Sequence, residues 1–182
     1  LLLVGISHRT APLELRERLD FHARGLDKAL RALCESRSAV RETAILSTCN
    51  RAEMYAAAED VPAAKAELLR FFSDYHGIDA KAVSPHAYDQ LDLDAARHLF
   101  RVAAGLDSLV VGEPQILGQV KDAHTAATSV QSAGPLLNRL FHSSFAVGKR
   151  VRSETALGSG AVSVSFAAVA LAKKIFGDLK GR

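Results

Sequence analysis

The apolar positions in the first half of the chain alternate between strand-like and helical spacing. Leu1 to Ile6 forms a continuous apolar run that ends in a loop containing Pro12. Residues 25–36 carry apolar side chains at helical spacing, which predicts an amphipathic helix with Cys34 in the core. The same reasoning predicts strands at Thr43–Thr48 and Glu53–Ala58, a helix at Ala63–Tyr75 and a weak strand near Ala87–Asp89. This order predicts an α+β fold of the split-βαβ kind over residues 1–90.

In the second half of the chain the apolar residues recur at helical spacing almost throughout. The pattern predicts helices at about 92–104, from Pro114 to about 130, at about 136–153 and at 161–176. Asp92 is the expected N-cap of the first of these helices, and Pro114 is the expected first residue of the second. The last helix is apolar nearly all round, so we expect protein on several of its sides.

Composition narrows the class of protein. Of the 182 residues, 48% are hydrophobic and 24% are charged, and the net charge is +3, a mild basic bias compatible with a nucleic-acid partner. The two cysteines, Cys34 and Cys49, form no C-x-x-C pair, which argues against a zinc site or thioredoxin chemistry. The longest apolar stretch, Val162–Ala172, is too short for a membrane span. We therefore expect a cytoplasmic, soluble protein without a metal, and the abrupt ends suggest a piece of a longer chain.

The tetrapeptide Thr48-Cys49-Asn50-Arg51 is the first candidate for chemistry. It follows the apolar run of a predicted strand, so Cys49 is placed at a strand end with a cation two residues away. A nearby cation lowers the pKa of a thiol, and the thiolate is the nucleophilic form. The alternative is a structural cysteine in a turn.

His98 is the second candidate. The apolar residues of its helix are Leu93, Ala96, Leu99, Phe100 and Ala103. This stripe places His98 on the opposite face, beside Asp94 and Arg101. Either the imidazole is a solvated surface group or it faces a cleft as a base or orienting group, a role that its near-neutral pKa suits.

A third cluster lies between residues 105 and 119. Two glycines bracket an apolar patch that is followed by Glu113 at a helix N-terminus, where a carboxylate complements the helix dipole. Such a cluster also suits an amino-acid-sized ligand, with Glu113 binding its ammonium group. Further along, the helix at 136–153 has a basic side, formed by Arg139, His142, Lys149, Arg150 and Arg152, which either provides solubility or contacts phosphates. Neither a Walker loop nor G-x-G-x-x-G occurs in the sequence.

Taken together, these segments resemble glutamyl-tRNA reductases. The resemblance rests on residues 5–12 (GISHRTAP), 46–53 (LSTCNRAE), 98–108 (HLFRVAAGLDS), 112–121 (GEPQILGQVK) and 148–155 (GKRVRSET). It implies a ferredoxin-like α+β catalytic domain with added helices over residues 1–155, of which 91–155 are the helical part. It also implies that residues 156–182 are the start of a long spinal helix and a linker to an NADPH-binding domain that this sequence does not include.

The resemblance further implies a mechanism. Cys49 matches the family's nucleophile, which attacks the ester of glutamyl-tRNA to give a thioester that NADPH reduces to glutamate-1-semialdehyde for tetrapyrrole synthesis. His98 matches a histidine needed for activity, and Arg51 matches a clamp for the substrate carboxylate. The other positions that match the family's substrate-binding residues are Thr48, Asn50, Ser108, Glu113, Pro114, Gln115 and Gln119. Implied partners are glutamate-1-semialdehyde aminotransferase and, through a separate dimerisation domain, a second copy of the chain.

Two alternatives remain open at this point. The chain is either competent for the acyl-transfer or esterase half of the reaction, or it is a module that binds tRNA or a partner without turnover, as the basic helix suggests. A cysteine hydrolase with a Cys49–His98 pair is a further alternative, and it predicts turnover of simple esters without tRNA.

Overall fold

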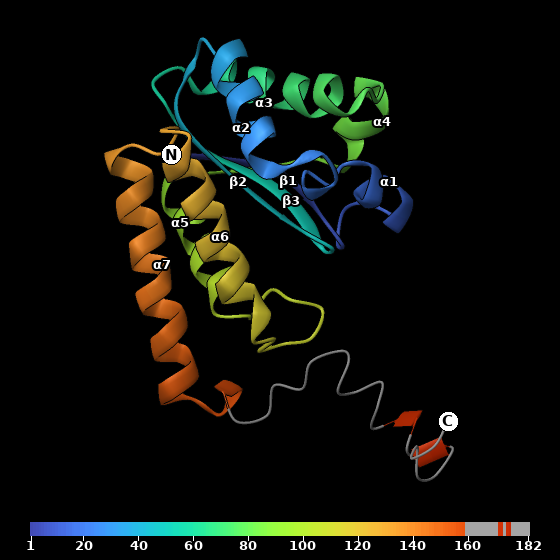
Figure 1. The fold of residues 1–182 in the computed structure, drawn as a ribbon, viewed down its shortest axis with the longest axis vertical. Helices are drawn as coiled ribbons and strands as arrows, with labels where there is room; N and C mark the ends of the chain where they lie inside the picture. The colour runs from blue at the N-terminus through green and yellow to red at the C-terminus, as the bar shows by residue number, and fades with distance from the viewer. Residues whose placement is uncertain (159–170, 173, 176–182) are drawn as a thin grey trace.

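Four antiparallel strands form the sheet around which the described part of the chain is built (Figure 1). The computed structural model describes residues 1–158, 171–172 and 174–175. The strands are β1 (Leu2–Ser7), β2 (Val40–Thr48), β3 (Arg51–Ala58) and β4 (Tyr88–Leu91). Their order across the sheet is β2-β3-β1-β4, so the two central strands are β3 and β1. This order confirms the predicted α+β fold with a ferredoxin-like, split-βαβ core.

Helices cover both faces of the sheet. They are α1 (Leu13–Arg18), α2 (Leu26–Ser36), α3 (Val61–His76), α4 (Ala80–Val83), α5 (Asp92–Ala103), α6 (Gln115–Ser129) and α7 (Pro135–Glu154), with short 3-10 turns η1 (His22–Arg24), η2 (Ser84–His86) and η3 (Ala156–Gly158). Helices α2 and α3 lie on one face, and α5, α6 and α7 lie on the other (Figure 1). The result is a three-layer arrangement in which the sheet is buried on both sides.

The central strand β3 faces two different environments. Ala52, Met54 and Ala56 alternate with Arg51, Glu53 and Tyr55, and each of these six residues is buried. Because successive side chains of a strand point to opposite faces, Arg51, Glu53 and Tyr55 share one face. The Tyr55 ring packs edge-on against Phe141 of α7, with 5.9 Å between centroids. The polar face of β3 therefore lies under the layer formed by α5, α6 and α7.

Two features fix α7 in this layer. The Glu42 carboxylate of β2 accepts hydrogen bonds from the N–H groups of Gly134 (3.1 Å), Leu136 (3.2 Å) and Leu137 (2.8 Å) at the start of the helix. It satisfies donors that have no partner within the helix and complements the helix dipole. Further along, a Cβ on Gly148 would lie 2.7 Å from the Ala103 carbonyl of α5, so the two helix backbones meet where only glycine fits.

Several predictions about the elements need correction. Cys34 is half-buried rather than in the core, because the buried stripe of α2 is formed by Ala29, Leu30 and Leu33 and leaves position 34 at its edge. Helix α5 has no side-chain N-cap, since Asp92 is its first residue, and Pro114 immediately precedes α6. The predicted helix at 161–176 and the start of a spinal helix fall largely outside the described residues. Within the described residues, no helix is both long enough and apolar enough to span a membrane.

Candidate active site

Cys49 lies in the two-residue turn that joins β2 to β3. Thr48 and Arg51 pair across the sheet, so the turn itself consists of Cys49 and Asn50. The Thr48 hydroxyl accepts hydrogen bonds from the backbone N–H groups of Asn50 (3.1 Å) and Arg51 (3.2 Å), which closes the turn. The predicted place of Cys49 at the end of a strand is confirmed, and the residue is exposed.

Neighbouring segments hold this turn in place. The His8 N–H donates to the Asn50 carbonyl (2.8 Å), and the Arg16 guanidinium of α1 donates to the Cys49 carbonyl (2.5 Å). The β1–α1 region therefore fixes the two carbonyls of the turn, those of Cys49 and Asn50. An accessible sulfur on a fixed backbone suits a nucleophile, because the thiolate must reach its substrate in one orientation.

Next to the turn, β3 carries a buried ionic network. Arg51 Nη1 donates to Glu53 Oε1 (2.8 Å), and these residues are only 2% and 0% exposed. The Glu53 carboxylate also accepts from the hydroxyls of Tyr55 (2.8 Å) and Tyr88 (2.5 Å). His98 Nε2 of α5 lies 2.8 Å from Glu53 Oε1. Since a carboxylate only accepts, Nε2 carries a proton in this contact.

The network also fixes its own charge states. Burial alone would raise the pKa of Glu53, but the Arg51 charge and the hydrogen bond from His98 lower that pKa to about 2. Burial likewise opposes the charge of Arg51, yet Glu53 raises the pKa of the guanidinium above its ordinary value. Burial and the Glu53 charge raise the pKa of the Tyr88 hydroxyl. At neutral pH the network is thus an ion pair surrounded by neutral hydroxyl donors.

The loop between α5 and α6 contacts the same network. Arg51 Nη2 donates to the Asp107 carbonyl. The Asp107 carboxylate lies 2.5 Å from Arg9 Nη2 and 3.7 Å from His98 Nδ1. Arg51 and Asp107 therefore connect β3, the β1–α1 loop and the α5–α6 loop at one point.

Gly105 gives that loop its shape. Its φ of +76° is a conformation that side-chain-bearing residues rarely adopt, and a Cβ there would lie 3.0 Å from Gly112 Cα. The Gly112 N–H donates to the Gly105 carbonyl (2.9 Å), so the loop closes on itself between these glycines. This closure holds Asp107 against the network, and Asp107 and Ser108 are both buried, at 6% and 8% exposed.

A cavity of about 520 Å³ opens beside His98. Its walls come from the end of β1 and the loop after it, from β4 and from α5. The lining residues are Ser7, Arg9, Thr10, Tyr88, Gln90, Asp94, Arg97, His98, Arg101 and Asp107. The volume is in the range of small-molecule sites, and each of these residues has a polar or charged side chain. Cys49 is not among the lining residues, so the thiol and this cavity are separate features of one region.

The remaining predicted site residues lie at the start of α6. Pro114 and Gln115 are exposed, whereas Glu113 and Gln119 are half-buried. The structure brings Arg51, His98 and the loop containing Ser108 together. The Glu113 N–H donates to the Val110 carbonyl of that loop (3.1 Å). Among the described residues, no hydrogen bond or ion pair joins Glu113, Gln115 or Gln119 to the side chains of Arg51 and His98.

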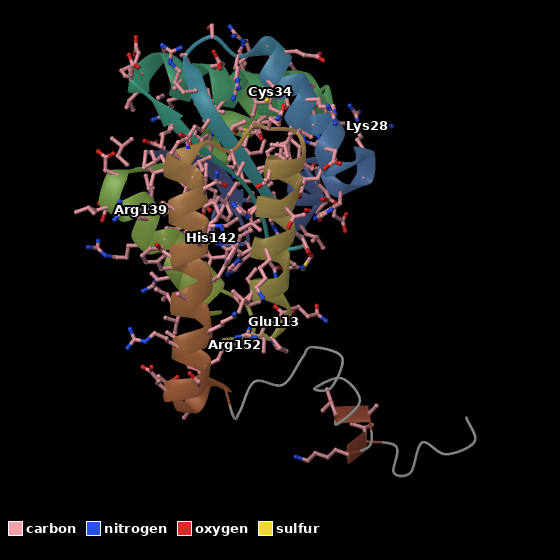
Figure 2. The ribbon with its side chains drawn as sticks, turned by 60° about the vertical axis from the view of Figure 1, so that its left-hand side comes forward. Lys28, Cys34, Glu113, Arg139, His142 and Arg152 are labelled. Atoms are coloured by element: carbon pink, nitrogen blue, oxygen red, sulfur yellow. The ribbon has the colours of Figure 1, made fainter. Side chains whose placement is uncertain are left out.

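Arg152 does not belong to the exposed basic face predicted for α7. It is half-buried, and its guanidinium donates to the carbonyls of Glu113 (2.6 Å) and Pro114 (3.0 Å). Arg152 and Glu113 lie side by side near the end of α7 (Figure 2). The side chain therefore fastens the segment before α6 to the last turn of α7.

His98 is buried and does not lie on the solvent face that the helical spacing predicted, but it lines the cavity, in agreement with the alternative in which it faces a cleft. It is 9% exposed, because the buried stripe of α5 is Ala95, His98, Leu99, Val102 and Ala103 rather than the stripe that begins at Leu93, which is itself 79% exposed. The buried imidazole is tolerated since Glu53 accepts its hydrogen bond. Its predicted neighbours Asp94 and Arg101 do line the same cavity.

Glu53, Tyr88 and Asp107 are site residues that the sequence reasoning missed. A signal existed for Glu53: it is a charged residue in an otherwise apolar strand, two positions from Arg51 and so on the same face. Tyr88 and Asp107 reach the site through contacts distant in sequence, for which the local pattern carries no signal.

Comparison with known proteins gives a consistent result. The family model described as "Glutamyl-tRNAGlu reductase, N-terminal domain" matches residues 4–155. The chain is 53% identical over 181 residues to the glutamyl-tRNA reductase of Syntrophotalea carbinolica, covering 100% of this chain and 41% of that protein. It is 50% identical over 182 residues to the enzyme of Geobacter sulfurreducens, covering 100% of this chain and 42% of the relative.

A solved structure shows the same relation in three dimensions. The glutamyl-tRNA reductase from Methanopyrus kandleri matches with a TM-score of 0.75 and 35% identity, covering 97% of this chain and 40% of that chain. The chain therefore spans about two fifths of the length of the proteins it matches.

Proposed function

Because the chain belongs to the glutamyl-tRNA reductase family, we propose that it is the part of such an enzyme in which Cys49 takes the glutamyl group from glutamyl-tRNA. The observation that carries the proposal is the exposed Cys49 in a turn whose two carbonyls accept hydrogen bonds from Arg16 and His8. An exposed thiol beside buried charges is unlike a cysteine used for packing.

The proposed step is an acyl transfer. The Cys49 sulfur attacks the carbonyl carbon of the glutamyl ester, and a C–S bond forms. The C–O bond to the terminal ribose then breaks, the ribose oxygen leaves with a proton, and the product is a glutamyl thioester. A thioester accepts a hydride more readily than an ester, which makes it a sensible intermediate before reduction.

His98 is proposed to position groups at this step and to take up or supply the proton through Nδ1. Its Nε2 proton is committed to Glu53, so the imidazole has one tautomer and one orientation. Glu53 thereby acts through His98 and is a positioning residue, since it is fully buried.

Arg51 is proposed to bind a carboxylate of the substrate. Two of its nitrogens already donate to Glu53 and to the Asp107 carbonyl, while Nε has no hydrogen-bond partner among the described residues. A buried donor without a partner is costly, and a substrate carboxylate would satisfy it. The other proposed substrate-binding residues are Thr48, Asn50, Ser108, Glu113, Pro114, Gln115 and Gln119.

The reduction itself is assigned to parts of the enzyme beyond this chain. NADPH supplies a hydride where it is bound, but the sequence contains no glycine-rich dinucleotide fingerprint. The residues of this sequence therefore do not fit that cofactor. Tetrapyrrole synthesis, dimerisation and transfer of the semialdehyde to an aminotransferase are proposals for the whole enzyme.

The test is intact-protein mass spectrometry after the chain is mixed with glutamyl-tRNA. We expect an increase in mass by one glutamyl group that hydroxylamine removes and that Cys49→Ser abolishes. Cys34→Ser is the matched control, because it removes the other cysteine and should keep the adduct. An adduct that disappears in the Cys34 variant, or an absence of any adduct, contradicts the proposal.

The second candidate is a module that binds tRNA without turnover. The observation in its favour is the basic surface of α7, where Arg139, His142 and Lys149 are exposed. Two other residues weaken it: Arg150 pairs with Glu154 (3.0 Å), and Arg152 is bound to backbone carbonyls. Retained tRNA binding with no adduct would favour this candidate.

A further inference from the structure

The cavity beside His98 has a cationic rim that the acyl transfer to Cys49 does not use. Asp94, Arg97 and Arg101 lie three to seven positions apart on α5, so one face of this helix forms a wall of the cavity. Arg9 approaches from the loop after β1. Three guanidinium groups thus line the cavity of about 520 Å³.

These three arginines are not equally available. Arg9 pairs with Asp107 (2.5 Å), and Arg97 pairs with Asp94 (2.5 Å). Arg101 is exposed and has no ion pair among the described residues. Within the described part of the chain, Arg101 is therefore the arginine of this rim whose charge is not balanced by a carboxylate. The three arginines outnumber Asp94 and Asp107, so the lining has a net positive charge.

The chemistry of the rim suits a phosphodiester. A guanidinium binds phosphate oxygens through parallel N–H groups, and arginine is the usual choice at such contacts. Gln90, Thr10 and Ser7 add neutral hydrogen-bonding groups for a ribose. The exposed basic face of α7 offers less to an RNA than its sequence suggests, because Arg150 and Arg152 are already engaged.

We propose that this cavity binds a phosphodiester of the single-stranded 3′ end of the tRNA, with Arg101 as the main phosphate contact and Arg97 beside it. This inference rests on the proposed function, since it adds the place where the RNA part of the glutamyl-tRNA lies. It places the acceptor end against α5 while the glutamyl group reaches towards the β2–β3 turn.

The test measures how RNA affinity depends on salt concentration. The probe is an uncharged RNA hairpin, one that carries no amino acid, with a single-stranded 3′-CCA end, and the 182-residue chain is compared with its Arg101→Gln variant. Loss of one contact to a single-stranded phosphate should reduce the slope of log K against log salt by about 0.7. Arg139→Gln, an exposed arginine on α7, is the matched control and should leave the slope unchanged.

A second arm identifies the source of the anion. A hairpin without the CCA end should show the same slope for the wild type and for Arg101→Gln, because the contacted phosphate is gone. An equal slope for the wild type and the Arg101 variant on the full probe overturns the proposal, and so does a loss that follows Arg139 instead. If Arg101→Gln impairs only acylation by an RNA-free glutamyl ester, the arginine binds the substrate carboxylate and the proposal is wrong.

The acylation arm also separates this inference from the proposed function. Normal acylation of Cys49 by an RNA-free glutamyl ester, with a reduced RNA slope in the Arg101 variant, supports both. A reduced slope without acylation of Cys49 by any ester supports the phosphate site and refutes the nucleophile.

Discussion

Replacing Glu53 with glutamine removes the charge at the centre of the buried network while keeping its shape. Glu53 is fully buried and contacts Arg51, His98 and two tyrosine hydroxyls. In Glu53→Gln the buried Arg51 guanidinium loses its closest counter-charge, and the Asp107 carboxylate remains 3.8 Å from Arg51 Nη1. Breaking a buried pair in this way typically costs about 3–5 kcal/mol of folding free energy.

The pH dependence gives a second measure of the same energy. The pKa of Glu53 falls from 4.5 to about 2 on folding, a difference that corresponds to roughly 3 kcal/mol. Because the pKa is lower in the folded chain, this stabilisation is complete above about pH 4.5 and is lost as the pH falls towards 2. The difference in free energy of unfolding between the wild type and Glu53→Gln should therefore be about 3 kcal/mol or more at pH 7. It should become smaller as the pH falls from 4.5 towards 2.

The assay is urea unfolding followed by circular dichroism at pH 7, pH 4.5 and pH 3. Glu59→Gln is the control, because the Glu59 side chain is 86% exposed and lies 3.8 Å from Arg41. A surface pair of this kind contributes little, so its free energy of unfolding should change by less than about 1 kcal/mol. A gap below about 1 kcal/mol for Glu53→Gln at pH 7, or a gap that does not depend on pH, would refute the reasoning.

Three further predictions concern stability. Glu42→Gln should cost about 1–2 kcal/mol in urea unfolding, since the charged acceptor for the N–H groups at the start of α7 is lost. Gly105→Ala should lower the free energy of unfolding by about 1–2 kcal/mol, because position 105 has a positive φ and an added Cβ would contact the loop backbone. Gly118→Ala is the matched control within α6: an added Cβ there meets no atom within 4 Å, so the free energy of unfolding should rise by about 0.5–1 kcal/mol. Burial and the Arg24 charge lower the pKa of His76 to about 4, so wild-type stability should fall as the pH drops from 6.5 to 4, and less so in His76→Gln.

The elements of the sheet were predictable because their signals are local. The apolar runs of β2 and β3 and the interruption between them placed Cys49 at a strand end, as observed. The strand order followed from the order of elements along the chain, since the split-βαβ arrangement leaves few alternatives. For α7 the helical spacing predicts six buried positions, of which Val151 is only half-buried and the other five are buried: Leu137, Leu140, Phe141, Ser144 and Gly148.

The charged interior of the site was not predictable in the same way. A hydrophobicity pattern assigns His98 to the solvent side, because it treats every polar residue as exposed. The structure buries His98 on account of Glu53, forty-five positions away in the sequence. The prediction that Arg152 is exposed is wrong for the same reason: its guanidinium binds loop carbonyls that are distant in sequence, and these contacts keep it half-buried.

The length of the β2–β3 turn has a consequence for how this protein tolerates change. Two residues separate the paired Thr48 and Arg51, and this spacing sets which side chains of β3 meet the α5–α7 layer. A single inserted residue that shifted the register would exchange Arg51 and Glu53 with Ala52 and Met54 across the sheet. Hairpin tips usually accept insertions. In this chain the tip holding the proposed nucleophile also sets the strand register, so variation in length is excluded there while longer loops elsewhere remain free to vary.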